Sequence, residues 1–174
     1  PGTNYIVIYQ HYWNLTMFSS WKQFIAIILF IMIAVKGQDT NAFERSCIVK
    51  PDENGTVIIP SNRTDIPPAA FLKCTELKNV VIPFGITRIG LAAFAGTSLE
   101  NVYLPDSILE IEDSAFHTCI SLTSIRLSRN LDHIGESVFK NNFILRNITI
   151  PDSVTSLSKR GKVFQSCLKL EYMS

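Results

Sequence analysis

The chain has 174 residues, of which 47% are hydrophobic and 18% are charged. These values are ordinary for a folded protein with one sizeable core. The formal net charge is +1 and the lysines and arginines are scattered, so nothing indicates a basic surface for nucleic acid, and we expect no nucleic-acid partner.

A short apolar run lies near the N-terminus. It covers 12 residues, Phe24 to Val35, whereas a bilayer-spanning helix needs about 20. Lys22 precedes the run, no acidic residue lies within 17–37, and Val35 and Gly37 are compact residues near its end. This pattern predicts a signal peptide over residues 17–37 that is cleaved after Gly37. The chain is therefore expected to be secreted or displayed at the cell surface.

An uncleaved hydrophobic N-terminal helix is the alternative, because residues 5–17 are also fairly apolar. The chain would then be anchored in a membrane, and in either case membrane contact comes only from targeting or anchoring. Residues 1–16 match nothing downstream, and we interpret them as upstream translated sequence or an error in gene prediction.

Residues 38–60 are predicted to form an N-terminal cap. Two apolar stretches, 47–50 and 56–59, flank the segment Pro51-Asp52-Glu53-Asn54-Gly55, which ends in a strong turn dipeptide. We expect a β-hairpin that covers the first repeat.

The rest of the chain, residues 61–174, is built from a repeat of about 23 residues. Two columns keep the same step. The first column is Phe71, Phe94, Phe116, Phe139 and Phe164, and the second is Pro60, Pro83, Pro105, Ser128 and Pro151. We count about five repeats, of which the last is incomplete.

Each repeat predicts a short strand, a corner and a helical turn. The pattern L-x-x-I-x-I-P gives a strand with one inward face, which the proline ends because it has no N–H to donate. A second pair of apolar residues, such as Ile108 and Ile111, follows at the corner. The A-F-x-x-C step then places apolar residues three apart, as in a helical turn on the far side. One repeat buries too little to fold alone, so the repeats must stack with their strands in parallel.

This pattern resembles the BspA-like leucine-rich repeat. The resemblance covers Val57 to Met173 and implies an α/β solenoid, with short parallel strands on a concave face and short helical turns on a convex face. It also implies a surface protein with a role in binding or adhesion, and it supplies no catalytic residue. The departures from the pattern are Gly96-Thr97 with one residue missing before Leu99, Asn142 in the cysteine column, Ser128 for proline, and an insertion within 158–162.

The four cysteines leave one plausible disulfide. Cys74, Cys119 and Cys167 fall in alternate repeats, so they should lie about 10 Å apart, beyond the reach of a bridge. Cys47 with Cys74 remains as a clamp on the cap. Three Asn-x-Thr triplets predict N-glycosylation in a eukaryotic secretory route, with Asn62 as the best acceptor, followed by Asn54 and Asn147.

No motif for a nucleophile, a metal or a phosphate is present, and we predict a chain that is not an enzyme and has no catalytic residue, metal site or cofactor. Binding is expected on the exposed side of the strands, through Tyr103 and Arg126 with Val81 and Asn101 beside them. The expected function is a secreted or surface-displayed recognition scaffold for a protein or glycan. The alternative is a fragment of a larger receptor ectodomain or structural protein, anchored by its N-terminal apolar segment.

Overall fold

The computed structural model describes residues 47–157 and 162–173. The chain divides into two units, residues 1–39 and 40–174, and the solenoid belongs to the second. The predicted signal peptide or hydrophobic helix at 17–37, and residues 1–16, lie outside the described residues. Over the described ranges, no helix has the length and apolar character to span a membrane.

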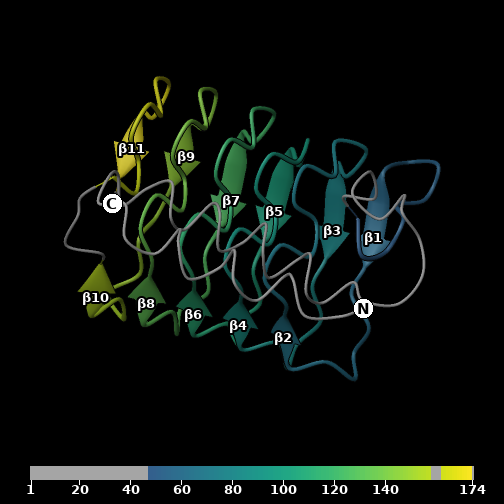
Figure 1. The fold of residues 1–174 in the computed structure, drawn as a ribbon. Coiled ribbons are helices and arrows are strands. Elements are labelled where there is room, and N and C mark those ends of the chain that lie inside the picture. The colour runs from purple at the N-terminus through teal and green to yellow at the C-terminus, as the bar shows by residue number, and fades with distance from the viewer. Residues whose placement is uncertain (1–46, 158–161, 174) are drawn as a thin grey trace, which may run out of the picture. The chain divides into compact units, whose positions relative to one another are not determined.

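The solenoid contains two rows of parallel strands (Figure 1). The first row consists of β1 (Thr56–Ile58), β3 (Asn79–Val81), β5 (Asn101–Tyr103), β7 (Ser124–Arg126), β9 (Asn147–Ile148) and β11 (Tyr172–Met173). The second row consists of β2 (Asp65–Ile66), β4 (Arg88–Ile89), β6 (Glu110–Ile111), β8 (His133–Ile134) and β10 (Ser156–Leu157). One circuit of the chain through a first-row strand, a second-row strand and a turn segment is called a coil below. The parallel strands predicted from the repeat are thus confirmed, and a second row is added at the corner.

The first row is interrupted between β3 and β5. The strands pair as β1-β3 and as β11-β9-β7-β5, whereas the second row is one sheet of five strands. The interruption coincides with the coil that lacks one residue before Leu99. The two coils still touch there, because the backbone N–H of Glu100 donates to the carbonyl of Lys78 at 3.1 Å. The missing residue therefore changes the strand pairing and leaves the stacking intact.

The predicted phenylalanine column is the centre of the core. Phe94, Phe116 and Phe139 have no exposed surface, and each ring stacks on the ring of the next coil. Along the whole column the ring centroids are 5.2–5.8 Å apart and the rings lie within 13° of parallel. Offset stacking of aromatic rings adds to the free energy gained from burial. Each coil therefore stabilises the two coils that flank it.

The predicted helical turns are wrong: the A-F-x-x-C segments form tight turns, and the described residues contain no helix. Left-handed residues flank each of the first four phenylalanines, for example Ala69 and Lys73, with φ of 54° and 58°. The backbone N–H groups of Ala69, Phe71 and Lys73 donate to carbonyls of the next coil at 2.7–2.8 Å. A helix is about 10 Å wide, too wide for coils stacked at a strand spacing of about 4.8 Å. The turns fit that spacing and bond laterally.

In the cysteine column, the members other than the disulfide-bonded Cys74 supply hydrogen-bond donors to the phenylalanine backbone. The Cys119 thiol donates to the carbonyl of Phe94 at 3.2 Å. Two departures from the repeat keep a donor at this place: the Thr97 hydroxyl donates to Phe94 at 2.9 Å, and the Asn142 amide donates to Phe116 at 2.9 Å. Donor capacity explains why cysteine, threonine and asparagine share one column, since a buried carbonyl without a partner costs free energy.

The predicted cap differs from the structure. Residues 47–50 form no strand, and β1 pairs in parallel with β3, so no antiparallel hairpin forms and residues 56–58 belong to the first coil. The expected turn is present, with Gly55 at a φ of 75° and its N–H donating to the Asp52 carbonyl at 2.9 Å. Cys47 and Cys74 form a disulfide with their Cα atoms 5.2 Å apart, which ties the preceding segment to the first coil.

Candidate functional site

The outward side chains of the first row form the candidate site. Val102 and Ile125 point into the core and are 4% exposed, so the alternation of the strand turns Tyr103 and Arg126 outward. The register pairs Tyr103 with Arg126 across the β5–β7 ladder. The same register places Asn101 beside Ser124.

Arg126 lies over the ring of Tyr103. Its Cζ atom is 4.5 Å from the ring centroid, and the Tyr103 side of the pair is 60% exposed. The guanidinium also donates two hydrogen bonds. Nη1 donates to the Leu104 carbonyl at 3.1 Å, and Nη2 donates to Asp106 Oδ1 at 3.0 Å. An arginine stacked on an aromatic ring gains about 0.5–2 kcal/mol. The pair is therefore ordered before any ligand arrives.

Asp106 joins this pair to a second arginine. The backbone N–H of Arg129 donates to Asp106 Oδ1 at 3.0 Å, and Arg129 Nε lies 3.6 Å from Oδ2. That backbone hydrogen bond, helped by the positive charges of Arg126 and Arg129, lowers the pKa of Asp106. The carboxylate therefore stays ionised across the physiological range and keeps both arginines in place.

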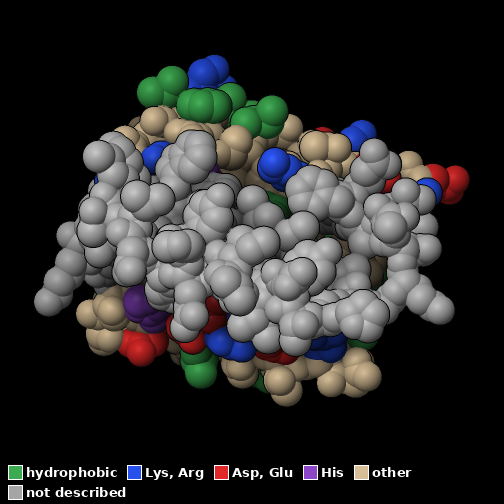
Figure 2. Space-filling view, viewed as in Figure 1, with side chains coloured by type: hydrophobic (Ala, Val, Ile, Leu, Met, Phe, Trp, Pro, Cys, Tyr) green, Lys and Arg blue, Asp and Glu red, His purple; other side chains and the backbone are tan. Residues whose placement is uncertain are grey.

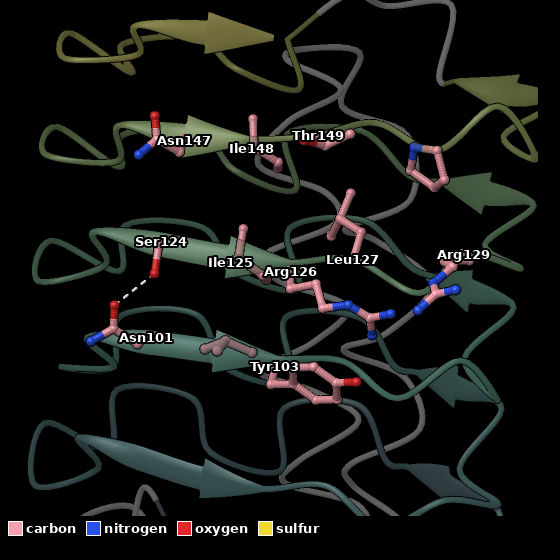
Figure 3. A pocket seen from close by; sticks show the side chains of 12 residues that line it. Asn101, Tyr103, Ser124, Ile125, Arg126, Leu127, Arg129, Asn147, Ile148 and Thr149 are labelled. Carbon is pink, nitrogen blue, oxygen red and sulfur yellow. Dashed lines mark hydrogen bonds between the residues drawn. The ribbon is translucent and has the colours of Figure 1, made fainter. Parts of the chain in front are cut away.

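A shallow groove of about 590 Å³ runs over β5, β7 and β9 (Figure 3). Its lining comes from all three strands and the residues that follow them: Asn101, Val102, Tyr103, Ser124, Ile125, Arg126, Leu127, Arg129, Asn147, Ile148, Thr149 and Pro151. Figure 3 shows Arg126 leaning toward Tyr103, away from Thr149 on the neighbouring strand. At the other end of the strands, Asn101 Oδ1 accepts a hydrogen bond from Ser124 Oγ at 2.6 Å.

The structure brings three of the four predicted binding residues to this groove. Tyr103, Arg126 and Asn101 line it, whereas Val81 lies outside it on β3 and is 51% exposed. Sequence reasoning missed Arg129, whose side chain is 80% exposed. The sequence feature that could have indicated Arg129 is its position directly after Ser128, the member of the proline column at which the strand ends.

The three predicted glycosylation residues are exposed. Asn54 lies in the turn before β1, and Asn62 lies in the turn that follows Pro60. Asn147 is the first residue of β9 and lines the groove. Its use as a glycan acceptor stays a prediction, and a glycan there would stand in the groove.

The titratable side chains outside the groove are held by the fold. Burial raises the pKa of the Cys119 thiol to about 11 and lowers the pKa of His117. His133 Nδ1 lies 3.1 Å from Ser156 Oγ on the second row. In residues 47–157 and 162–173, no three His, Cys, Asp or Glu residues are grouped as metal ligands. The groove itself presents apolar side chains, two arginines and hydrogen-bonding amides and hydroxyls.

Comparison with known proteins places this geometry in a family. The model for the BspA type leucine-rich repeat region matches residues 39–171 in six copies. A comparison with curated proteins gave no match. The six copies begin within the segment predicted as a cap, in agreement with the parallel pairing of β1.

Solved structures of bacterial leucine-rich repeat proteins are similar to this chain. The T. pallidum leucine-rich repeat protein is 32% identical with a TM-score of 0.64, over 68% of this chain and 57% of that protein. The pneumococcal vaccine antigen PcpA is 26% identical with a TM-score of 0.56, over 72% of this chain and 32% of PcpA. A leucine-rich repeat protein from Bacteroides ovatus, 24% identical with a TM-score of 0.54 over 68% of this chain and 37% of that one, shares the fold.

The chain thus spans 57% of the T. pallidum protein and a smaller share of the other two. The repeat pattern, the parallel solenoid and these similarities agree with one another. This chain belongs to the family of proteins with BspA type leucine-rich repeats.

Proposed function

We propose that this chain is a recognition and adhesion scaffold, secreted or displayed at the cell surface, that binds a protein or glycan through the groove over β5, β7 and β9. Membership of a repeat-scaffold family supports a binding role, since solenoids present extended surfaces to their partners. The observation that carries the proposal is the stacked pair of Tyr103 and Arg126, ordered beside a groove.

Two properties make this pair suitable as a binding centre. Tyrosine and arginine are enriched among the residues that dominate binding free energy. The contacts of Arg126 with Leu104 and Asp106 fix its side chain. Little conformational entropy of this side chain is therefore lost when a ligand binds.

The experiment uses the full chain in pull-downs from surface and extracellular-matrix preparations and on a glycan array. The double variant Tyr103→Ala/Arg126→Ala should lose binding by about thirtyfold or more, the loss expected for a dominant contact. Lys140→Ala, on the turn segment of the fourth coil, is the matched control and should bind as wild type. Circular dichroism checks that both variants fold. Undiminished binding by the double variant, or loss in the Lys140 control, would refute the groove as the site.

A further inference from the structure

An apolar row continues the groove across the start of the solenoid. Ile58, Val81 and Tyr103 stand in the same outward position of β1, β3 and β5, and they are 70%, 51% and 60% exposed. Ile58 and Val81 are direct register partners. Phe84 follows β3 and is 79% exposed. These four residues are called the apolar row below.

Phe84 belongs to this surface by its place in the repeat. It stands in its coil where Asp106 and Arg129 stand in the next two coils. Asp106 contacts Arg126, which is the successor of Tyr103 in the outward column. Phe84 therefore follows its strand at the position that Asp106 occupies one coil later, and Asp106 is the residue that Arg126 contacts.

The surface changes character along the solenoid. Over β1, β3 and β5 the outward column is apolar, and over β7 and β9 it continues with Arg126 and Thr149. The row that begins with Phe84 changes in the same direction, to Asp106 and then Arg129. The apolar row and the groove, which is lined by two arginines, therefore meet at Tyr103 on one face.

We infer that the ligand of this face is a protein segment that sets apolar side chains against the apolar row and an acidic group against Arg129. The inference rests on the proposed function and narrows it from a protein or glycan to a peptide chain of stated chemistry.

Aliphatic exposure favours a protein over a glycan. Sugar rings stack on aromatic side chains, and within the apolar row Phe84 and Tyr103 have such faces. Ile58 and Val81 have none, and sugar hydroxyls placed against them would lose water without gaining a hydrogen bond. Contiguous apolar surface with a polar rim is typical of protein interfaces. An apolar segment of a partner chain removes this surface from water, which is favourable.

Charge favours an acidic group at the other end. The charged side chains that line the groove are Arg126 and Arg129. Both face the single carboxylate of Asp106, which leaves one positive charge in excess among the three. Arg126 already donates to Leu104 and Asp106, whereas Arg129 reaches Asp106 through Nε at 3.6 Å and is 80% exposed. Asp152, the next member of that row, is exposed and does not line the groove. Arg129 is therefore the side chain placed to meet a carboxylate.

The test selects peptides from a random display library with the full chain as bait. We expect enriched sequences that combine a cluster of aromatic or aliphatic residues with Asp or Glu at one end. A synthetic copy of the leading peptide, and a second copy with its acids replaced by lysine, are then measured by isothermal titration. The lysine copy should bind at least about tenfold more weakly.

Variants of the chain test the contact with the apolar row and the contact with Arg129 separately. Val81→Thr and Phe84→Ser should each weaken the acidic peptide by about fivefold or more, and Arg129→Glu should weaken it by about tenfold and strengthen the lysine copy. Leu168→Ser removes an apolar side chain that is 77% exposed on another part of the solenoid, and it should bind as wild type. Circular dichroism and thermal midpoints verify folding.

The outcomes separate this inference from the proposed function. Glycans bound on the array in a manner that depends on Tyr103 and Arg126, with no peptide enriched, would refute the inference and keep the groove as the site. Enriched peptides whose affinity is unchanged by Val81→Thr, Phe84→Ser and Arg129→Glu would refute the inference as well. Enriched peptides that also bind the Tyr103→Ala/Arg126→Ala variant with unchanged affinity would overturn both the inference and the proposed function.

Discussion

The side-chain amide of Asn142 donates to the carbonyl oxygen of Phe116 in the preceding coil, 2.9 Å away, and to that of Phe139 at 2.8 Å. Asn142 has no exposed surface. Its own oxygen Oδ1 is buried and, within the described part of the chain, has no hydrogen-bond partner. Asparagine thus performs the donor role of this column and adds one unsatisfied acceptor.

Substitution at this residue should separate the two effects. Asn142→Cys keeps a donor and removes the unsatisfied oxygen, so we expect a stability equal to wild type or higher. Asn142→Val removes the donor and should cost about 1–3 kcal/mol, because buried carbonyls lose a partner. Urea unfolding of the two variants gives the free energies. A cysteine variant less stable than the valine variant would contradict the donor role.

The phenylalanine column should dominate stability. Phe116→Ala opens a cavity and removes the stacking contacts with Phe94 and Phe139, whose ring centroids lie 5.2 and 5.8 Å away. The expected loss is about 3–5 kcal/mol. Ile120→Ala is the control, since that side chain is 55% exposed in the same segment and should cost little. Similar shifts of the unfolding midpoint in the two variants would show that the column is not the core.

The Cys119 thiol should be unreactive in the folded protein. Its pKa of about 11, raised by burial, leaves about one thiol in a thousand ionised at pH 8. Because the thiolate is the reactive form, alkylation of Cys119 should be negligible until the chain unfolds, and the small reactive fraction should grow as the pH rises. Mass spectrometry after timed alkylation, with and without denaturant, measures this. Fast native labelling at pH 8 would mean that the residue is accessible.

The disulfide should stabilise the first coil. Cys47→Ser opens a link between residues 27 apart and should cost about 2–4 kcal/mol, because the link restricts the unfolded chain. Cys167→Ser, which removes a half-buried free thiol, is the matched control. Differential scanning calorimetry under non-reducing conditions compares them. In addition, a reducing agent should lower the melting temperature of wild type and leave that of Cys47→Ser unchanged.

Most of the fold could be predicted from the period of the sequence. Two columns in step located β3, β5, β7 and β9, their inward residues and the neighbours Tyr103 and Arg126, because parallel stacking places equal positions side by side. The second row was harder to foresee. Its strands are two residues long, too short to show an alternation, although their buried members such as Ile111 and Ile134 were recognised as inward.

The turns and the groove depend on features that the period does not express. A three-residue apolar spacing fits a helical turn and a left-handed turn equally well. Apart from Gly96, the left-handed positions of these turns hold alanine, lysine, serine, threonine or asparagine, so they lack the glycine that would have given a signal. Arg129 is the basic residue in a column whose other members are Phe84, Asp106 and Asp152, so the column predicts no basic side chain at this position. Asp106 holds Arg126 beside Tyr103 at one side of the groove, and such a contact between unlike positions leaves no trace in a repeat.

The interruption between β3 and β5 also sets how this solenoid would respond to mechanical load. At the other junctions from β1 to β9, neighbouring coils share hydrogen bonds on the first row, the second row and the turns, whereas at this junction the first row contributes no paired strands. The paired strands β4 and β6 and the turn bonds, such as that from Phe94 to Ala115, remain as the fastening. A force that bends the solenoid open along the binding face therefore meets its least resistance between Val81 and Tyr103, in the middle of the apolar row.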